Sequence, residues 1–276
     1  MNLVVQGPGA EAAHATEAAR LSCASRVEQL APSAFRLRGA QKNAALLEWC
    51  QEHKLDCACV PEGRRFTDLK LLAMDMDSTL IAIECIDEIG DMAGKKAAIA
   101  AITARAMRGE IDYAKSLSER VALLAGLGQD ALQRVYDERL RLSPGAEALI
   151  GVCKKHGVKL LLVSGGFTYF TERLKQRLAL DYTISSELEI RDGKLTGALA
   201  GRIVDAAAKA ARFREVAKAL GASRDQMVAI GDGANDLQMM AEAGTSVAYR
   251  GKPAVKAKAT MALDYSGLDG VIHLFE

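Results

Sequence analysis

The stretch Leu71-Leu72-Ala73-Met74-Asp75-Met76-Asp77-Ser78-Thr79 decides the fold. Its first four residues form a short apolar run, which is typical of a strand buried on both faces of a parallel sheet. Two acids follow, and a turn just past a strand can direct both carboxylates into one crevice, where they repel unless a cation sits between them or one of them holds a proton. Mg²⁺ with a phosphate group meets that need. Acidic turns without a ligand are common, so this pair alone does not establish a site.

Strands and helices alternate through the rest of the chain. Residues 182–199 alternate around Arg191-Asp192-Gly193-Lys194, a typical hairpin turn. Apolar patterns predict further strands at 159–163, 227–230 and 246–249, and helices at 205–220 and 236–243. This βαβ alternation predicts an α/β fold with a doubly wound parallel sheet, whose ligand site lies beyond the carboxyl ends of its strands.

Two segments differ from this core. Residues 86–143 have an almost entirely helical pattern and predict an all-α insertion after the first strand of the sheet. Residues 1–68 predict a separate small α+β domain, and residues 69–276 the larger one. In the small domain we expect strands at 3–6, 35–38 and 57–60, an alanine-rich helix that follows the breaker Gly7-Pro8-Gly9 and runs to about Leu30, and a second helix at 42–54.

Polar clusters follow two other predicted strands. Ser164-Gly165-Gly166 offers a hydroxyl and glycine N–H groups that can hold phosphate oxygens, although an ordinary glycine turn has the same pattern. Gly231-Asp232-Gly233-Ala234-Asn235-Asp236 adds two acids at the same sheet edge, and it is not a dinucleotide fingerprint because Asp236 replaces the third glycine. Lys209 lies on the preceding helix, where a solvated side chain is the simplest interpretation of a lone lysine.

Charge and composition exclude several classes of protein. The 276 residues include 36 Lys and Arg against 35 Asp and Glu, a net charge of +1, which argues against a binder of nucleic acid or anionic membranes. No apolar run approaches the ~20 residues of a membrane span, and no signal peptide is visible, so a cytoplasmic location is expected. The six cysteines are expected to be reduced, and the spacing of Cys57 and Cys59 does not favour zinc.

The order of these motifs along the chain resembles the signature of the haloacid-dehalogenase (HAD) superfamily over roughly residues 70–265. That order is a strand followed by DxDxT, a strand followed by Ser, a helix with Lys, and a strand followed by GDxxxD. Longer segments resemble the phosphoserine phosphatase family within it. These segments are Met74–Thr79, Glu84–Ile89, Ala106–Gly109, Ser164–Phe167 and Gly231–Asp236. The resemblance implies a Rossmann-like core, with residues 86–143 as the helical cap.

The resemblance also implies chemical roles. Asp75 would be the nucleophile that forms an aspartyl-phosphate, and Asp77 the general acid that protonates the leaving oxygen and then the base that activates water. Mg²⁺ would be held by Asp75, the main-chain carbonyl of Asp77, and Asp232. Support for this metal shell would come from Asn235 and Asp236.

The other implied residues bind the substrate. The phosphoryl oxygens would be neutralised by Lys209 together with Ser164 and the Gly165 N–H. Glu84 would hold the ammonium group of the substrate, and Arg120 its carboxylate. A surface salt bridge to Glu119 or Asp112 is the alternative for Arg120. Two side chains of the insertion would line an apolar wall, Met107 and Tyr113.

The implied activity is the Mg²⁺-dependent hydrolysis of O-phospho-L-serine to L-serine and phosphate, the last step of serine biosynthesis. The alternatives are a superfamily enzyme acting on another small phosphomonoester, such as phosphohomoserine, and a non-catalytic amino-acid sensor. The family often carries a small amino-acid-binding (ACT-like) domain at its N-terminus, and the predicted β-α-β-α-β order of residues 1–68 is one strand short of that pattern. The oligomeric state is left open, with a homodimer among the possibilities.

Overall fold

Two β-sheets organise the computed structural model, which describes residues 1–276. The larger sheet has seven strands in the order β11-β10-β9-β5-β6-β7-β8, with β8 antiparallel and the others parallel. The strands are β5 (Leu71–Asp75), β6 (Lys159–Phe167), β7 (Tyr182–Arg191), β8 (Lys194–Ala200), β9 (Met227–Gly231), β10 (Thr245–Tyr249) and β11 (Met261–Leu263). The predicted doubly wound parallel sheet is confirmed.

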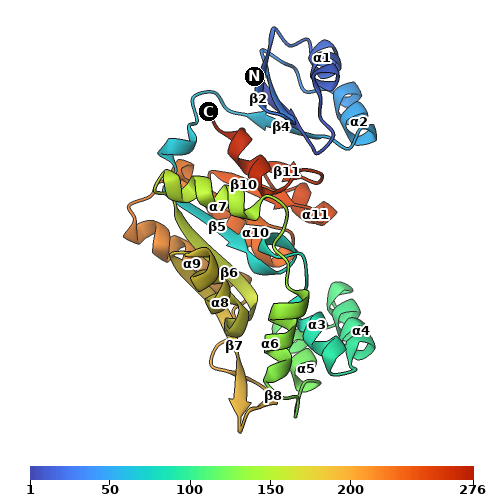
Figure 1. The fold of residues 1–276 in the computed structure, drawn as a ribbon, viewed down its shortest axis with the longest axis vertical. Coiled ribbons are helices and arrows are strands. Elements are labelled where there is room, and N and C mark those ends of the chain that lie inside the picture. The colour runs from blue at the N-terminus through green and yellow to red at the C-terminus, as the bar shows by residue number, and fades with distance from the viewer.

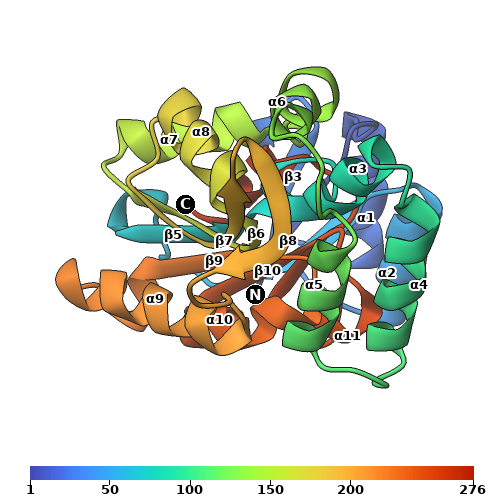
Figure 2. The same cartoon turned by 90° about the horizontal axis from the view of Figure 1, so that it is seen from below.

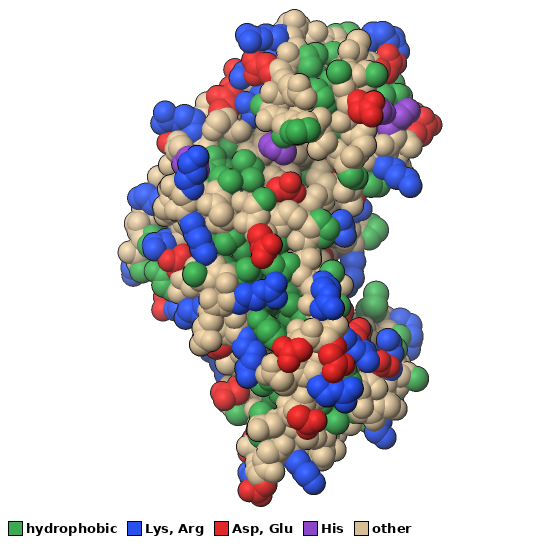
Figure 3. All heavy atoms as spheres, viewed as in Figure 1, with side chains coloured by type: hydrophobic (Ala, Val, Ile, Leu, Met, Phe, Trp, Pro, Cys, Tyr) green, Lys and Arg blue, Asp and Glu red, His purple; other side chains and the backbone are tan.

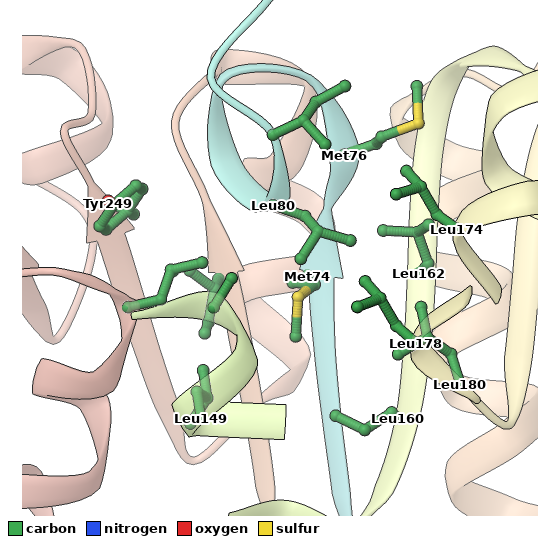
Figure 4. Close-up of a cluster of buried hydrophobic side chains, with 14 of the residues drawn as sticks. Met74, Met76, Leu80, Leu149, Leu160, Leu162, Leu174, Leu178, Leu180 and Tyr249 are labelled. Carbon is green, nitrogen blue, oxygen red and sulfur yellow. The ribbon is translucent and has the colours of Figure 1, made fainter. Parts of the chain in front are cut away.

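Helices cover both faces of this sheet (Figure 2). One face carries α7 (Ala146–Lys155) and α8 (Thr168–Leu178), and the other α9 (Ala206–Ala219) and α10 (Leu237–Glu242). Successive strand residues point to opposite faces. In β5, Met74 therefore belongs to the same apolar cluster as Leu149 of α7 (Figure 4), whereas Ala73 belongs to the cluster around α9 and α10. Because both faces are buried, the strand sequences are continuously apolar.

The all-α insertion is also confirmed and forms the cap at the lower right of Figure 1. It lies between β5 and β6, and an isolated β-bridge joins its two ends, Ile81 and Leu142. None of the helices in the chain combines the length and apolarity that a membrane span requires. The cap consists of α3 (Cys85–Met92), α4 (Lys96–Met107), α5 (Tyr113–Ala122), α6 (Asp130–Arg134) and the helical turn Val135–Arg139.

Details of the core differ from the sequence-based expectations. Ser164-Gly165-Gly166 was expected in a turn, but it lies inside β6, whose pairing with β7 becomes irregular there before α8 begins. A short helix, α11 (Pro253–Lys256), and the edge strand β11 were not predicted, because four and three residues carry no periodic signal. The hairpin turn is confirmed, with φ of 51° at Asp192 and 72° at Gly193.

The N-terminal unit contains one more strand than expected. The prediction of a helix to about Leu30 is wrong, because α1 ends at Leu21, and the chain turns through Cys23 (φ 52°) into β2. The elements are β1 (Asn2–Gln6), α1 (Ala12–Leu21), β2 (Arg26–Ala31), β3 (Ala34–Arg38), α2 (Ala44–Glu52) and β4 (Asp56–Val60). They form an antiparallel sheet in the order β2-β3-β1-β4, a ferredoxin-like β-α-β-β-α-β arrangement.

The N-terminal sheet packs on the C-terminal end of the chain (Figure 1). Val4 and Val60 belong to the same apolar cluster as Leu268 and Phe275. Beside them, the Asp56 carboxylate is 5% exposed and accepts backbone N–H bonds of 2.7 Å from Asp264 and 2.8 Å from Ser266, with longer ones from Tyr265. A shared core and a buried carboxylate therefore fix the two units against each other.

Side chains of both charges are interspersed on the face seen in Figure 3. Lysines and arginines alternate there with aspartates and glutamates, and no extended basic surface is visible on this face. This mixture agrees with the net charge of +1.

The substitution Asp56→Ala should destabilise the protein, because it leaves buried N–H groups of residues 264–266 without an acceptor. We expect a loss of roughly 2–4 kcal/mol in the free energy of unfolding, measured by urea titration. The control is Asp68→Ala, which removes an exposed ion pair with Arg65 and should leave the urea midpoint nearly unchanged. Equal midpoints for the two variants would contradict a stabilising role for Asp56.

Candidate active site

The candidate site lies where the carboxyl ends of β5, β6 and β9 face the cap. A cavity of about 690 Å³ opens there, with walls from both the core and the cap. It brings together most of the residues singled out in the sequence. The predicted residues on its wall are Asp75, Asp77, Glu84, Met107, Tyr113, Arg120, Gly165, Asp232 and Asn235.

Lys209 is the buried charge beneath this cavity. It reaches from α9 to the ends of two strands, and its Nζ lies 2.8 Å from Asp75 Oδ1 and 2.8 Å from Asp236 Oδ1. Lys209 and Asp236 are fully buried, and Asp75 is 4% exposed. Burial alone lowers the pKa of Lys209, but the two carboxylates outweigh it and the pKa is raised. The simplest interpretation of Lys209 as a solvated lysine is therefore wrong, and its side chain lies buried between two carboxylates.

Three carboxylates beside this lysine form a cluster that fits a divalent cation. Oxygens of Asp75, Asp232 and Asp236 lie within 4.8 Å of one another. Burial and the neighbouring Asp236 raise the pKa of Asp75, and the same two causes raise that of Asp232 to about 6. Clustered hard oxygen donors with excess negative charge are the ligand set that Mg²⁺ or Ca²⁺ prefers. The cluster contains two residues of the predicted metal set and adds Asp236, while the Asp77 carboxylate is not among its members.

The Asp77 carboxylate is held in a turn after β5 by two donors. Its Oδ1 accepts a 2.8 Å bond from Cys85 N, and its Oδ2 a 3.3 Å bond from Ser164 Oγ. Ser78 adopts a left-handed φ of 56°, which reverses the chain at this point. A Cβ at Gly166 would lie 2.7 Å from Asp77 Oδ2, so glycine is needed there. Burial raises the pKa of Asp77 despite these donors, so this carboxyl group holds a proton more readily than an exposed one.

Glu84 and Arg120 contribute opposite charges to the wall of the cavity. Glu84 accepts a 2.7 Å hydrogen bond from Ser78 Oγ, and burial, then the charge of Asp77, raises its pKa to about 7. Arg120 donates from Nε to the Ser116 carbonyl at 3.3 Å and forms no ion pair. The alternative of a surface salt bridge for Arg120 is wrong, since Glu119 pairs with Arg105 and Asp112 accepts from Lys115 N.

Three charged residues of the wall were missed in the sequence: Asp87, Asp205 and Lys252. Asp205 caps α9, where its Oδ1 accepts a 2.8 Å bond from Ala208 N. Asp87 lies one helical turn after Glu84, and this spacing of three residues on α3 could have indicated it. Burial raises the pKa of Asp87, and the Arg120 charge opposes that rise. Lys252 precedes α11, and its backbone N–H donates to the Asp232 carbonyl at 3.0 Å. No pattern marks Lys252, because only the chain reversal after β10 brings it to the cavity.

Family models match most of the chain. The haloacid dehalogenase-like hydrolase model matches residues 72–241, which include Asp75, Lys209 and Asp236. Residues 3–46 match a family described only as a domain of unknown function.

Comparison with individual proteins identifies a narrower family within these hydrolases. The chain is 53% identical over 215 residues to a phosphoserine phosphatase from Polaromonas sp., an alignment that covers 76% of this chain and 91% of that protein. An unliganded crystal structure of a probable phosphoserine phosphatase from Vibrio cholerae superposes with a TM-score of 0.87 and 36% identity, over 99% of this chain and 86% of that one. A phospho-aspartyl intermediate analogue of phosphoserine phosphatase superposes with a TM-score of 0.71 and 36% identity, over 75% and 99%. The chain therefore belongs to the haloacid dehalogenase-like hydrolases, and among them to the phosphoserine phosphatase family.

Proposed function

We propose that this protein hydrolyses O-phospho-L-serine to L-serine and phosphate through an aspartyl-phosphate on Asp75. The observation that carries the proposal is the pairing of Asp75 with buried Lys209 beside Asp77, in a cavity that also presents Glu84 and Arg120. The first three residues suit phosphoryl transfer, and the last two suit the amino and carboxylate ends of an amino acid. This reaction is the last step of serine biosynthesis.

Asp75 is the nucleophile. Both of its strong contacts, from Lys209 Nζ and from Met76 N at 2.8 Å, fall on Oδ1. Oδ2 is therefore left free to attack phosphorus, while the oriented Oδ1 keeps the carboxylate fixed. A P–O bond forms to Asp75 as the P–O bond to the serine oxygen breaks, which is an established use of a carboxylate nucleophile.

Asp77 is the general acid and then the general base of the proposed reaction. Its raised pKa favours the protonated form, which donates to the leaving serine oxygen as the ester bond breaks. The resulting carboxylate then takes a proton from water, and that water attacks phosphorus and frees Asp75. The bond from Cys85 N keeps the Asp77 carboxyl group in one orientation through both steps.

The phosphoryl group requires positive partners. We assign Lys209, Ser164 Oγ and the Gly165 N–H to its oxygens, with Asn235 beside them on the cavity wall. A divalent cation, Mg²⁺ in this proposal, would be held by Asp75, the Asp77 carbonyl and Asp232, with Asp236 as support, since these oxygens suit it. When bound, the ion polarises the phosphoryl group and offsets its charge.

Recognition of the amino-acid end is assigned to the cap side of the cavity. The Arg120 guanidinium has no ion-pair partner in the protein, so a substrate carboxylate would supply one. Glu84 would hold the ammonium group, and Met107 and Tyr113 line the same wall. A related phosphomonoester such as phosphohomoserine would use the same chemical groups at a different distance from Arg120.

We also propose that residues 1–68 are a divergent amino-acid-binding (ACT-like) domain attached to a phosphatase domain of residues 69–276. The full β-α-β-β-α-β order supports this, since the strand that seemed missing from the sequence is β2. A cytoplasmic location is supported by six cysteines that are all unpaired. A homodimer stays a prediction from the sequence.

Substitution Asp75→Asn should abolish turnover, because an amide cannot attack phosphorus. We expect phosphate release at the background rate, with a circular dichroism spectrum equal to that of the wild type. Asp68→Asn, which changes an exposed acid far from the cavity, should keep full activity. Near-normal turnover by Asp75→Asn would remove Asp75 as the nucleophile.

Phosphate release from a panel of substrates tests both the substrate and the metal. Phosphoserine should be the best substrate with Mg²⁺ present, ahead of phosphohomoserine, phosphothreonine, phosphotyrosine and sugar phosphates. A chelator should silence the enzyme, Mg²⁺ should restore it, and Ca²⁺ should inhibit, because its larger, looser coordination shell misplaces the attacking carboxylate. Full activity in excess chelator would exclude Mg²⁺ from the proposed mechanism. If another compound is hydrolysed faster than phosphoserine, phosphoserine is not the preferred substrate and the proposed substrate is wrong.

Truncation of Arg120 separates recognition from chemistry. Arg120→Ala should lower kcat/KM for phosphoserine by roughly 30- to 4,000-fold, the effect of losing a charged partner in a poorly hydrated site. Hydrolysis of p-nitrophenyl phosphate, which has no carboxylate, should change little. Arg105→Ala is the matched control on the same cap, and it should leave kcat/KM unchanged for both substrates. Equal losses on both substrates would make Arg120 structural.

A further inference from the structure

The Tyr113 hydroxyl lies against the strand that carries the phosphoryl-binding groups. Tyr113 is the first residue of α5, and its side chain crosses the cavity from the cap to β6. A Cβ at position 165 would lie 3.0 Å from Tyr113 Cζ and would collide with the hydroxyl oxygen. Glycine at 165 is therefore what allows a cap phenol to reach the core.

This hydroxyl has polar surroundings and no partner. It neither donates nor accepts a hydrogen bond within the protein, and Tyr113 lines the same cavity as Asp75, Asp77 and Arg120. Burial raises the pKa of Tyr113 to about 12, so the O–H keeps its proton at neutral pH and remains a donor. An O–H that is unpaired at a charged cavity is suited to a ligand with acceptor oxygens.

We propose that the Tyr113 hydroxyl donates a hydrogen bond to a non-bridging oxygen of the phosphoryl group, which makes it a catalytic residue supplied by the cap. This inference rests on the proposed function, because it takes the phosphoryl position from Lys209, Ser164 and Gly165. A donor that touches Gly165 lies beside the N–H group assigned to the same oxygens. Donors aimed at phosphoryl oxygens lower the barrier as charge redistributes in the transition state.

The position of Tyr113 on α5 links the two ends of the substrate. Tyr113 and Arg120 are seven residues apart, so they lie on the same face of the helix, two turns from each other. One helix face would then offer a neutral donor to the phosphoryl group and a cation to the carboxylate. A phosphomonoester without a carboxylate would use the first contact and lack the second.

The test is Tyr113→Phe, which removes one oxygen atom and keeps the ring. We expect kcat/KM to fall roughly 10- to 100-fold for phosphoserine and for p-nitrophenyl phosphate alike, because both contain the phosphoryl group. The inhibition constant of inorganic phosphate should rise by a similar factor. The control Tyr136→Phe removes a hydroxyl from the cap outside the cavity and should change none of these values.

Two outcomes overturn the inference, and a third overturns only the proposed substrate. Unchanged kinetics and phosphate inhibition would mean that the hydroxyl contacts nothing in the complex. A loss confined to phosphoserine would place it on the amino-acid end, as for Arg120→Ala. If the wild type hydrolyses p-nitrophenyl phosphate but not phosphoserine, the proposed substrate fails, while the effect of Tyr113→Phe on p-nitrophenyl phosphate and on phosphate inhibition still tests the hydroxyl.

Discussion

The pairing of one buried lysine with two buried carboxylates constrains the core of this protein. Lys209, Asp75 and Asp236 come from α9, the end of β5 and the turn after β9. Removing one member of a buried ion pair leaves an unpaired charge and typically costs several kcal/mol, so the three elements must meet in one arrangement. The parallel register that sets Met74 beside Ile230 brings the two strand ends level and makes the contact possible.

The same cluster carries an excess of negative charge that the protein does not neutralise. Four carboxylates lie near one lysine, and burial raises the pKa of Asp75, Asp77 and Asp232. Nearby like charges disfavour ionisation of the group. In the proposed function, a divalent cation would relieve this repulsion for Asp75 and Asp232, whereas Asp77 lies outside the cluster of three and would hold a proton. One set of acids would then supply both a metal site and a general acid, because their positions differ.

The sequence predicted the parts of the core that follow from local pattern. Buried strands are continuously apolar, so the strands around Ala73 and Ile230 and the polar clusters that end them were evident. Two other features depend on contacts between distant segments and were not evident from the sequence. β2 is an exposed edge strand, with Val27 41% exposed, and its mixed pattern resembles the end of a helix. The burial of Lys209 depends on Asp75 and Asp236, and the approach of Lys252 on the turn after β10, which no spacing along the chain encodes.

The cap owes its position to the sheet as well as to its own connections. The hairpin of β7 and β8 extends from the sheet edge to the cap, where Gly126 N donates to Leu195 O at 2.8 Å and Gln129 N to Gly193 O at 2.9 Å. Gly197 packs so closely on α5 that a Cβ there would lie 3.2 Å from the Ala122 carbonyl.

β7 also pairs with β6, the strand that carries Gly165. The hairpin of β7 and β8 therefore connects β6 to α5. Arg120 and Tyr113 on α5 are therefore positioned relative to β6 by hydrogen-bonded backbone. In the proposed function, such a connection would keep recognition and chemistry in register, because backbone bonded at several points leaves little freedom for α5 to shift against the sheet.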